Sequence, residues 1–197
     1  MKNSKFWIWF IPVFIIVCIG VYFLLIKTSN EQELESKTNE DAIKIKELYE
    51  KNNDIEGYIK VELSKNNIYV YMTQEDINKL IKDGDGIIFF GEASSFAARK
   101  EISLLNEVVL STTIEKIYYV DIANIDNTLE NYILSNVNIG EIKAGDFVTI
   151  ENGKIIEYYD SKALDNDEYL TNEEKELLTH EYQRILKELV SACDEKC

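Results

Sequence analysis

The residues of this chain that could carry chemistry gather at one corner, which reads GEASSFAAR from Gly91 to Arg99. An apolar run ends at Gly91, small residues follow, and a helical pattern then begins. The first turn of a helix presents unpaired N–H groups and the positive end of its dipole, which together stabilise an anion such as a thiolate. The corner contains Ser94 and Ser95 but no Cys or His, so we expect it to supply a helix cap.

The sequence contains few His and Cys residues that could support metal or redox chemistry. The one histidine, His180, lies in a charged helical pattern and is predicted to be a surface residue, so neither a His-based metal site nor a cofactor is expected. Cys18 lies in an apolar run, whereas Cys193 and Cys197 end the chain. In an oxidising compartment this last pair could form a disulfide, and the alternative is two free thiols on a frayed end.

The elements that must position the corner follow from the hydrophobic pattern. Strands are predicted over Asn67–Met72, Ile87–Phe90, Ile117–Ile122, Phe147–Ile150 and Ile155–Tyr159, and Gly57–Leu63 alternates in a similar way. Helices are predicted after Thr73, from Phe96 to Val109, over Asn127–Val137 and from Thr171 onward. Asn152-Gly153 predicts a tight hairpin between the last two strands. The order is therefore β α β α β α β β α, an α/β fold.

An apolar run of 21 residues without a charge, Phe6 to Ile26, lies near the N-terminus. At about 1.5 Å per residue, a helix of this length spans the roughly 30 Å hydrocarbon core of a bilayer. No small-residue cleavage site follows the run, which predicts an uncleaved membrane anchor over residues 1–27. Because Lys2 and Lys5 precede the run, the positive-inside rule predicts a cytoplasmic N-terminus and an extracytoplasmic C-terminal domain in a single-pass protein.

The part of the chain after the anchor is strongly acidic. All 36 acidic residues but only 18 of the 21 basic ones follow Lys27, which gives this part a net charge of −18. Such a charge excludes binding to nucleic acid through electrostatics and predicts neutral or basic protein partners. Residues 28–54 read as a polar linker with a short helix over Asp41–Lys51, and the folded domain is expected to begin near Ile55 and to span residues 55–197.

Three short motifs carry a resemblance to a known family. Phe89-Phe90-Gly91 precedes the corner, Arg99 and Asn106-Glu107 follow it, and Asn152-Gly153-Lys154 marks the hairpin. In these motifs and in its element order the chain resembles the thioredoxin-like superfamily over about 130 residues. The corner is similar to that of small bacterial thioredoxin-like proteins, including those described as bacteriocin transport accessory proteins.

The chain departs from that family where the redox chemistry would lie. Alignment through the motifs places Ser95-Phe96-Ala97-Ala98 where the family has CxxC, and a hydroxyl with an alanine cannot cycle between dithiol and disulfide. The position of the family's cis-proline falls at Gly145, and the only proline of the chain is Pro12. Phe89 stands where thioredoxin itself buries an acid.

These departures favour a non-catalytic function. The resemblance implies a membrane-anchored binding or accessory module for assembly or transport. Its partner-binding face would comprise Ser94, Ser95, Phe96, Gly145 and Asp146, at the ends of the strands where α/β folds bind ligands. One alternative is a thiol–disulfide oxidoreductase that uses Cys193 and Cys197, and another is a structural component that assembles through its long helix or its linker.

Overall fold

A five-stranded mixed sheet forms the centre of the described part of the chain, residues 37–195 of the computed structural model. The strands are β1 Tyr69–Tyr71, β2 Gly86–Gly91, β3 Ile117–Asp121, β4 Phe147–Glu151 and β5 Lys154–Tyr159. Their order across the sheet is β1-β3-β2-β4-β5. β1, β3 and β2 run parallel, whereas β4 is antiparallel to both β2 and β5. The predicted α/β class is therefore observed.

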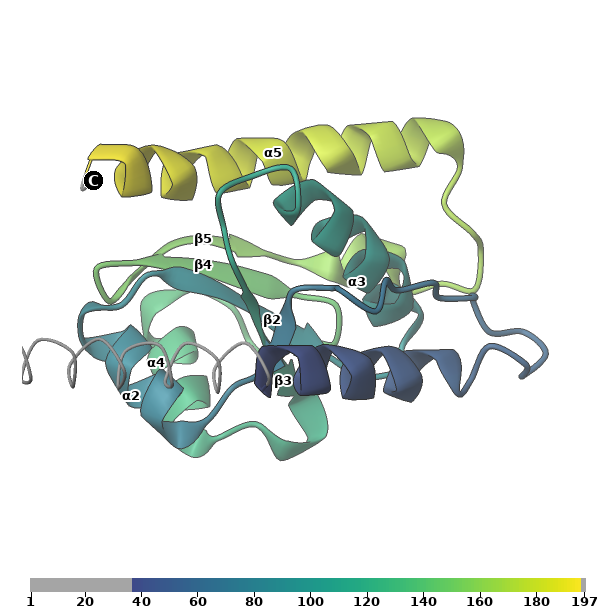
Figure 1. The fold of residues 1–197 in the computed structure, drawn as a ribbon, viewed down its shortest axis with the longest axis horizontal. Helices are drawn as coiled ribbons and strands as arrows, with labels where there is room; N and C mark the ends of the chain where they lie inside the picture. Colours follow the sequence, from purple (N-terminus) through teal and green to yellow (C-terminus); the bar gives the residue numbers. More distant parts are fainter. Residues whose placement is uncertain (1–36, 196–197) are drawn as a thin grey trace, which may run out of the picture. The chain divides into compact units, whose positions relative to one another are not determined.

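Helices cover both faces of this sheet (Figure 1). One layer contains α2 Gln74–Asp83 and α4 Asn127–Asn136, and the other contains α3 Phe96–Val109 and α5 Asn172–Glu195. Short 3-10 turns follow β3 at Ile122–Asn124 and β5 at Ser161–Leu164. Because β2 lies in the middle of the sheet with a helical layer on each face, four consecutive residues, Ile87 to Phe90, are fully buried. The element order predicted from the sequence is observed.

The hairpin between β4 and β5 also forms as predicted. Asn152 and Gly153 have φ angles of 50° and 68°, the left-handed values that a two-residue hairpin requires and that Asn and Gly tolerate best. Gly153 N–H donates to the carbonyl of Gly84 at 2.9 Å, so the turn is held against the end of α2. A Cβ atom at Gly153 would meet the carbonyl oxygen of Ile81 at 2.6 Å, which leaves glycine as the residue that fits.

The folded unit begins earlier than the sequence predicts. The chain divides into two compact units, and the second extends from Glu40 to Cys197, not from Ile55. Residues 37–50 are helical, and the side chains of Ile45 and Tyr49 are fully buried in the core, where the ring of Tyr49 packs against that of Tyr119 on β3. The short helix predicted over Asp41–Lys51 is thus observed, but it belongs to the folded unit. Most of its polar residues lie on the outer face of an amphipathic helix, so a polar composition here does not indicate a linker.

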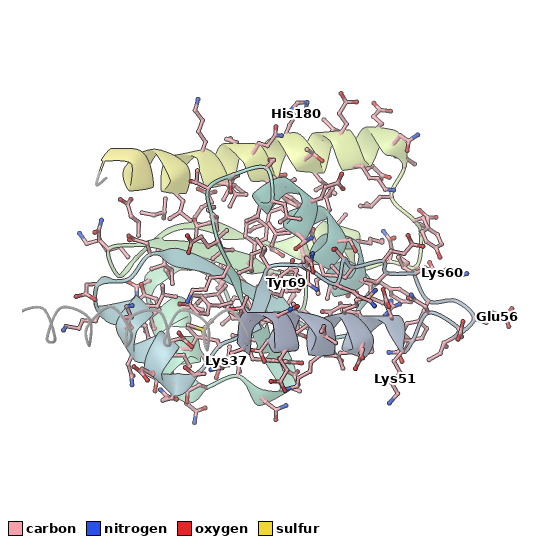
Figure 2. All side chains as sticks on the ribbon, viewed as in Figure 1. Lys37, Lys51, Glu56, Lys60, Tyr69 and His180 are labelled. Atoms are coloured by element: carbon pink, nitrogen blue, oxygen red, sulfur yellow. The ribbon has the colours of Figure 1, made fainter. Side chains whose placement is uncertain are left out.

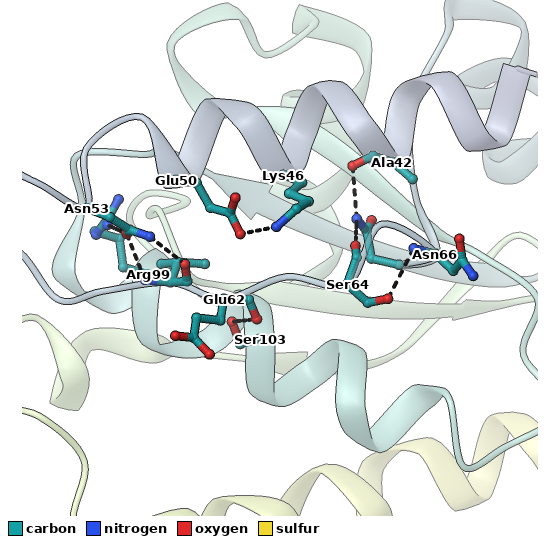
Figure 3. Close-up of polar contacts among 11 residues, drawn as sticks. Ala42, Lys46, Glu50, Asn53, Glu62, Ser64, Asn66, Arg99 and Ser103 are labelled. Carbon is teal, nitrogen blue, oxygen red and sulfur yellow. Dashed lines mark hydrogen bonds and ion pairs between the residues drawn. The ribbon is translucent and has the colours of Figure 1, made fainter.

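The segment from Gly57 to Leu63 is extended but pairs with no strand. Ile59, Val61 and Leu63 are buried while the residues between them are exposed, which explains the alternation in the sequence. Asn53 replaces a partner strand, because its side chain bonds both the N–H and the carbonyl of Val61, at 2.9 and 2.7 Å. Figure 3 shows this segment between helix 37–50 and α3.

The predicted anchor at Phe6–Ile26 lies outside the described residues. No helix within residues 37–195 combines the length and the apolar character needed to cross a bilayer. His180 lies on the outer side of α5 and is exposed, as its charged surroundings predict (Figure 2).

Candidate functional site

The corner between β2 and α3 is built around a serine cap. Ser95 is the N-cap residue of α3, and its Oγ accepts the N–H of Ala98 at 3.2 Å. Ser94 is exposed, and its hydroxyl donates to Oε1 of Glu92 at 2.6 Å. The capping function predicted for these serines is thus confirmed for Ser95, whereas Ser94 faces solvent with Glu92.

Gly91 ends β2 at the corner because an aromatic ring occupies the space of a side chain there. A Cβ atom at Gly91 would lie 2.1 Å from Cε2 of Tyr119 on the neighbouring β3. Phe89, two residues earlier, is fully buried and packs against Tyr69 and Tyr119 with ring centroids 5.6 and 6.2 Å apart. The strand therefore enters the corner through an aromatic core with no titratable acid at the position of Phe89.

A groove of about 600 Å³ opens beside the corner. Its apolar surface comes from Phe96, Ala97, Ile122 and Ala144, and its polar rim comes from Glu92, Ser94, Ser95, Glu141, Lys143, Ser161, Lys162 and Asp165. These residues belong to the start of α3, the end of β3, the loop before β4 and the turn after β5. The topology thus joins four segments that are distant in the sequence.

Of the five residues predicted to bind a partner, three line this groove and two lie beneath it. Ser94, Ser95 and Phe96 contribute to its surface. Gly145 and Asp146 are buried, and Asp146 is only 1% exposed, so neither presents a side chain to a partner. The structure therefore assigns Gly145 and Asp146 a positioning role.

Asp146 organises the loop below the groove through hydrogen bonds to its carboxylate. Oδ1 accepts the N–H and the hydroxyl of Ser161 at 2.8 and 2.9 Å. Oδ2 accepts the N–H of Lys143 at 2.8 Å and the hydroxyl of Tyr158. These bonds tie the loop before β4 to the turn after β5, and they stabilise a buried carboxylate without a cation.

Gly145 permits this loop to pack directly on α3. Its φ angle is +98°, and a Cβ atom there would lie 2.7 Å from Oγ of Ser161 and 3.0 Å from Cβ of Ala97. Gly145 N–H donates to the carbonyl of Phe90 at 2.7 Å. Proline has no N–H and a φ near −65°, so neither this bond nor this conformation is open to it. No cis peptide bond occurs in residues 37–195.

Arg99 supports the corner from below. The side chain is 1% exposed and bonds three backbone carbonyls, those of Ile59 at 2.5 Å, Tyr49 at 3.0 Å and Ala93 at 2.9 Å. Its remaining terminal nitrogen donates to Oδ1 of Asn53 at 2.8 Å (Figure 3). Desolvation lowers the pKa of the guanidinium, but arginine stays charged at any physiological pH. A single side chain thus joins helix 37–50, the segment after it and the corner.

The next residue of α3, Lys100, is also buried and also bonds backbone rather than an acid. Its ammonium donates to the carbonyls of Leu164 and Asn166 at 3.0 and 2.9 Å and to Oδ1 of Asn166 at 2.6 Å. All three ammonium protons are therefore used. Desolvation lowers the pKa of Lys100, and this residue fixes the loop that follows the groove.

Glu101 completes a run of three buried charged residues and lies between α3, β5 and α5. Its carboxyl is fully buried and accepts the hydroxyl of Tyr159 at 2.9 Å and the hydroxyl of Tyr182. Burial raises the pKa of Glu101 well above its ordinary value, and the nearby Asp146 and Glu181 raise it further. The environment of Glu101 therefore favours the protonated, neutral form of its carboxyl.

Sequence reasoning did not identify the structural role of Arg99, Lys100 and Glu101. These three residues are buried because helix 37–50, the loop after β5, and α5 enclose the first turns of α3. A helix that is buried on several sides must also bury its charged positions, and each of these then needs polar partners. Recognising this from the sequence would have required knowing that residues 40–50 belong to the core.

The site carries capping and positioning groups but no set of reactive side chains. Within residues 37–195, no cluster of three or more His, Cys, Asp or Glu side chains could hold a metal ion. The disulfide considered for Cys193 and Cys197 lies outside the described side chains. Comparison of the chain with protein-family models, curated proteins and solved structures gave no match.

Proposed function

We propose that this protein is a membrane-anchored, non-catalytic binding module of the thioredoxin-like type, which holds a protein partner at the groove beside Ser94, Ser95 and Phe96. The observation that carries the proposal is the groove itself, a preformed hollow that combines an apolar surface with a polar rim. Ser95 occupies the helix N-terminus as a cap, so the position at which a thiolate would react carries only a hydroxyl.

The thioredoxin-like part of the proposal is supported by the arrangement of the sheet. A parallel βαβ half is followed by a helix, an antiparallel hairpin and a closing helix, as expected from the resemblance. The corner follows the C-terminal end of the central strand β2 and packs against the loop that contains Gly145. In the thioredoxin-like family the equivalent corner and loop form the substrate face, and here they lie beside the groove.

The accessory part of the proposal is supported by rigidity on both sides of the groove. Arg99 fixes the carbonyl of Ala93 on one side, and Asp146 fixes the loop from Lys143 on the other. A surface that is ordered before binding loses less conformational entropy when a partner arrives. This order favours binding and does not require a reactive group.

The proposed location is the outer face of a cell membrane, with the N-terminus in the cytoplasm. The support is the 21-residue apolar run with Lys2 and Lys5 before it. Protease added to intact protoplasts should digest the C-terminal domain. Protection of the domain until the membrane is opened would contradict this orientation.

Site-specific photo-crosslinking of the full-length protein in its own membranes tests the binding function. A photoreactive residue at Ser94, on the rim of the groove, should capture a discrete protein band. The same residue at Leu110, which is 51% exposed at the far end of α3, is the matched control and should not. Capture from Ser94 that does not exceed capture from Leu110 would overturn the proposal.

A further inference from the structure

We infer that the partner presents basic side chains to this groove and is recognised through side chains rather than by adding a strand to its backbone. This inference rests on the proposed function and names the class of partner. Three observations carry it: unpaired carboxylates on the rim, an apolar floor between them, and a loop backbone whose polar groups are already bonded.

The rim of the groove has more carboxylates than cationic side chains. Among the described residues, Lys143 pairs with Glu141 at 3.4 Å, whereas Glu92 and Asp165 are in no ion pair. Both side chains are exposed, and the Glu92 carboxylate accepts the hydroxyl of Ser94. Within residues 37–195, Lys162 is in no ion pair either, and the buried Lys100 interacts electrostatically with Asp165. With three carboxylates and two lysines, the rim still carries a net negative charge.

The surrounding molecule strengthens the negative potential of the rim. The rim itself carries three carboxylates and two lysines, and the chain past Lys27 carries a net charge of −18, so the summed field attracts cationic groups to the groove. An acidic partner would meet repulsion at long range, and a neutral partner would leave both carboxylates unpaired. A segment with Lys or Arg side chains is complementary to the rim.

The floor of the groove selects for more than charge. Phe96 is half-buried at the first turn of α3 and packs against Tyr58 with ring centroids 6.0 Å apart, and Ile122 and Ala144 lie across the groove. Aromatic side chains that are partly covered in a concave surface are the usual anchors of an interface. We therefore expect an apolar side chain of the partner on Phe96, with basic side chains at the rim.

Strand addition at the loop before β4 is disfavoured because its backbone is already in use. Lys143 N–H bonds the Asp146 carboxylate, and the Lys143 carbonyl accepts the N–H of Asp146 at 3.2 Å. The carbonyl of Ala144 accepts the hydroxyl of Ser161 at 3.2 Å, and Gly145 N–H bonds Phe90. An added strand would compete with these internal bonds, so backbone pairing brings little net gain.

The test uses the photoreactive residue at Ser94 in the full-length protein and measures the yield of the captured band. Neutralising the rim in the double variant Glu92→Gln/Asp165→Asn should lower the yield about threefold or more and should weaken its dependence on salt. Phe96→Ala should lower the yield as well. Lys162→Gln removes the opposing charge and should raise it.

A matched control separates the local charge from the net charge of the domain. Glu75→Gln/Asp83→Asn removes two exposed carboxylates from α2, in the layer on the other face of the sheet, and changes the net charge by the same amount. Its yield should stay at the wild-type level. An equal loss in this control would overturn the local recognition that we infer.

The outcomes also distinguish this inference from the proposed function. If Ser94 captures a partner whose yield is unchanged or raised by Glu92→Gln/Asp165→Asn, the groove binds a partner but the partner is not basic. Sequencing of the captured segment gives a second readout, since a segment without excess Lys or Arg contradicts the inference. If Ser94 captures nothing, the proposed function itself fails.

Discussion

At the residue scale, the molecule depends on buried ionisable side chains whose hydrogen bonds go to uncharged polar groups. Arg99 and Lys100 bond carbonyls, Glu101 bonds two tyrosine hydroxyls, and Asp146 bonds N–H and hydroxyl groups. Removing such a group leaves its partners unsatisfied in the core, which costs more than the bond contributes when intact. Substitutions at these four positions should therefore destabilise the domain strongly.

The pH dependence of stability should reveal Glu101. Its pKa is raised in the folded protein above the ordinary value of 4.5, so between these two values the unfolded chain releases a proton that the folded protein keeps. The free energy of unfolding then falls by about 1.4 kcal/mol per pH unit as the pH rises above about 4.5, until the folded pKa is reached. Glu101→Gln removes this contribution.

Urea denaturation of both proteins from pH 5 to pH 8 measures the effect. The difference in the free energy of unfolding between Glu101→Gln and the wild type should shift in favour of the variant as the pH rises. Glu107→Gln, on the exposed side of the same helix, serves as the control and should follow the wild type. Parallel curves for Glu101→Gln and the wild type would show that Glu101 titrates normally.

Loss of the Arg99 side chain should be among the most harmful single changes in the domain. Arg99→Ala leaves the carbonyls of Tyr49, Ile59 and Ala93 without their donor, and we expect a loss of about 3 kcal/mol or more in the free energy of unfolding. Arg184→Ala removes an exposed arginine whose contact to Glu157 is 3.5 Å, and it should cost about 1 kcal/mol or less. Equal costs would contradict the role of Arg99.

Gly145 and Gly140 offer a matched pair for the loop before β4. Gly145→Ala forces a Cβ atom to within 2.7 Å of Oγ of Ser161 at a left-handed φ, and it should cost about 1–3 kcal/mol. A Cβ atom at Gly140 meets nothing within 4 Å, so Gly140→Ala should change the stability by about 0.5 kcal/mol or less. Thermal denaturation of the two variants compares them directly, and similar melting temperatures would contradict the proposed packing.

At the scale of elements, the corner between β2 and α3 forms a normal helix start although it contains no thiol. Ser95 caps α3 through Ala98 N–H, and the helix begins normally. Thiol–disulfide exchange needs a thiolate and a second thiol, and Ser95 with Ala98 supplies neither. The element keeps its geometry because capping depends on an acceptor oxygen and not on sulfur.

An insulin reduction assay should therefore find no activity that arises from this corner. Any thiol reactivity of a fragment that begins at Glu40, and therefore lacks Cys18, should disappear in the variant Cys193→Ser/Cys197→Ser. Activity that persists in this variant would contradict a redox-inactive corner. Activity that disappears with both cysteines would favour the alternative, an oxidoreductase that uses its C-terminal pair.

The elements that could be predicted from the sequence are those with a local signal. The Asn152-Gly153 turn, the cap at Ser95 and the apolar run of β2 each depend on neighbouring residues, and each is observed. The sequence predicts a short helix over Asp41–Lys51 but places it in a linker, because its partners in the core, such as Arg99 and Tyr119, are distant in the sequence. The site was predicted only in part. The roles of Gly145 and Asp146 could not be predicted, because they depend on contacts with Ser161 and other distant residues.

At the scale of the whole molecule, the boundary of the domain follows from the contacts of helix 37–50. A fragment that begins at Ile55 lacks Ile45 and Tyr49, which are fully buried, and leaves Arg99 without one of its carbonyl partners. We expect this fragment to be unfolded or loosely packed, whereas a fragment that begins at Glu40 should fold. Amide hydrogen exchange of the two fragments decides the matter, and equal protection would contradict it.

The bond between Tyr182 and Glu101 has a consequence for the order in which the chain acquires its structure. The two residues are 81 positions apart, and Tyr182 lies in the last helix of the chain. During synthesis the carboxyl of α3 therefore emerges long before the hydroxyl that helps to bury it, and until then it stays ionised in water. We therefore expect this layer to close only once α5 has been made, and a chain that ends before α5 should expose its unfinished core to proteases.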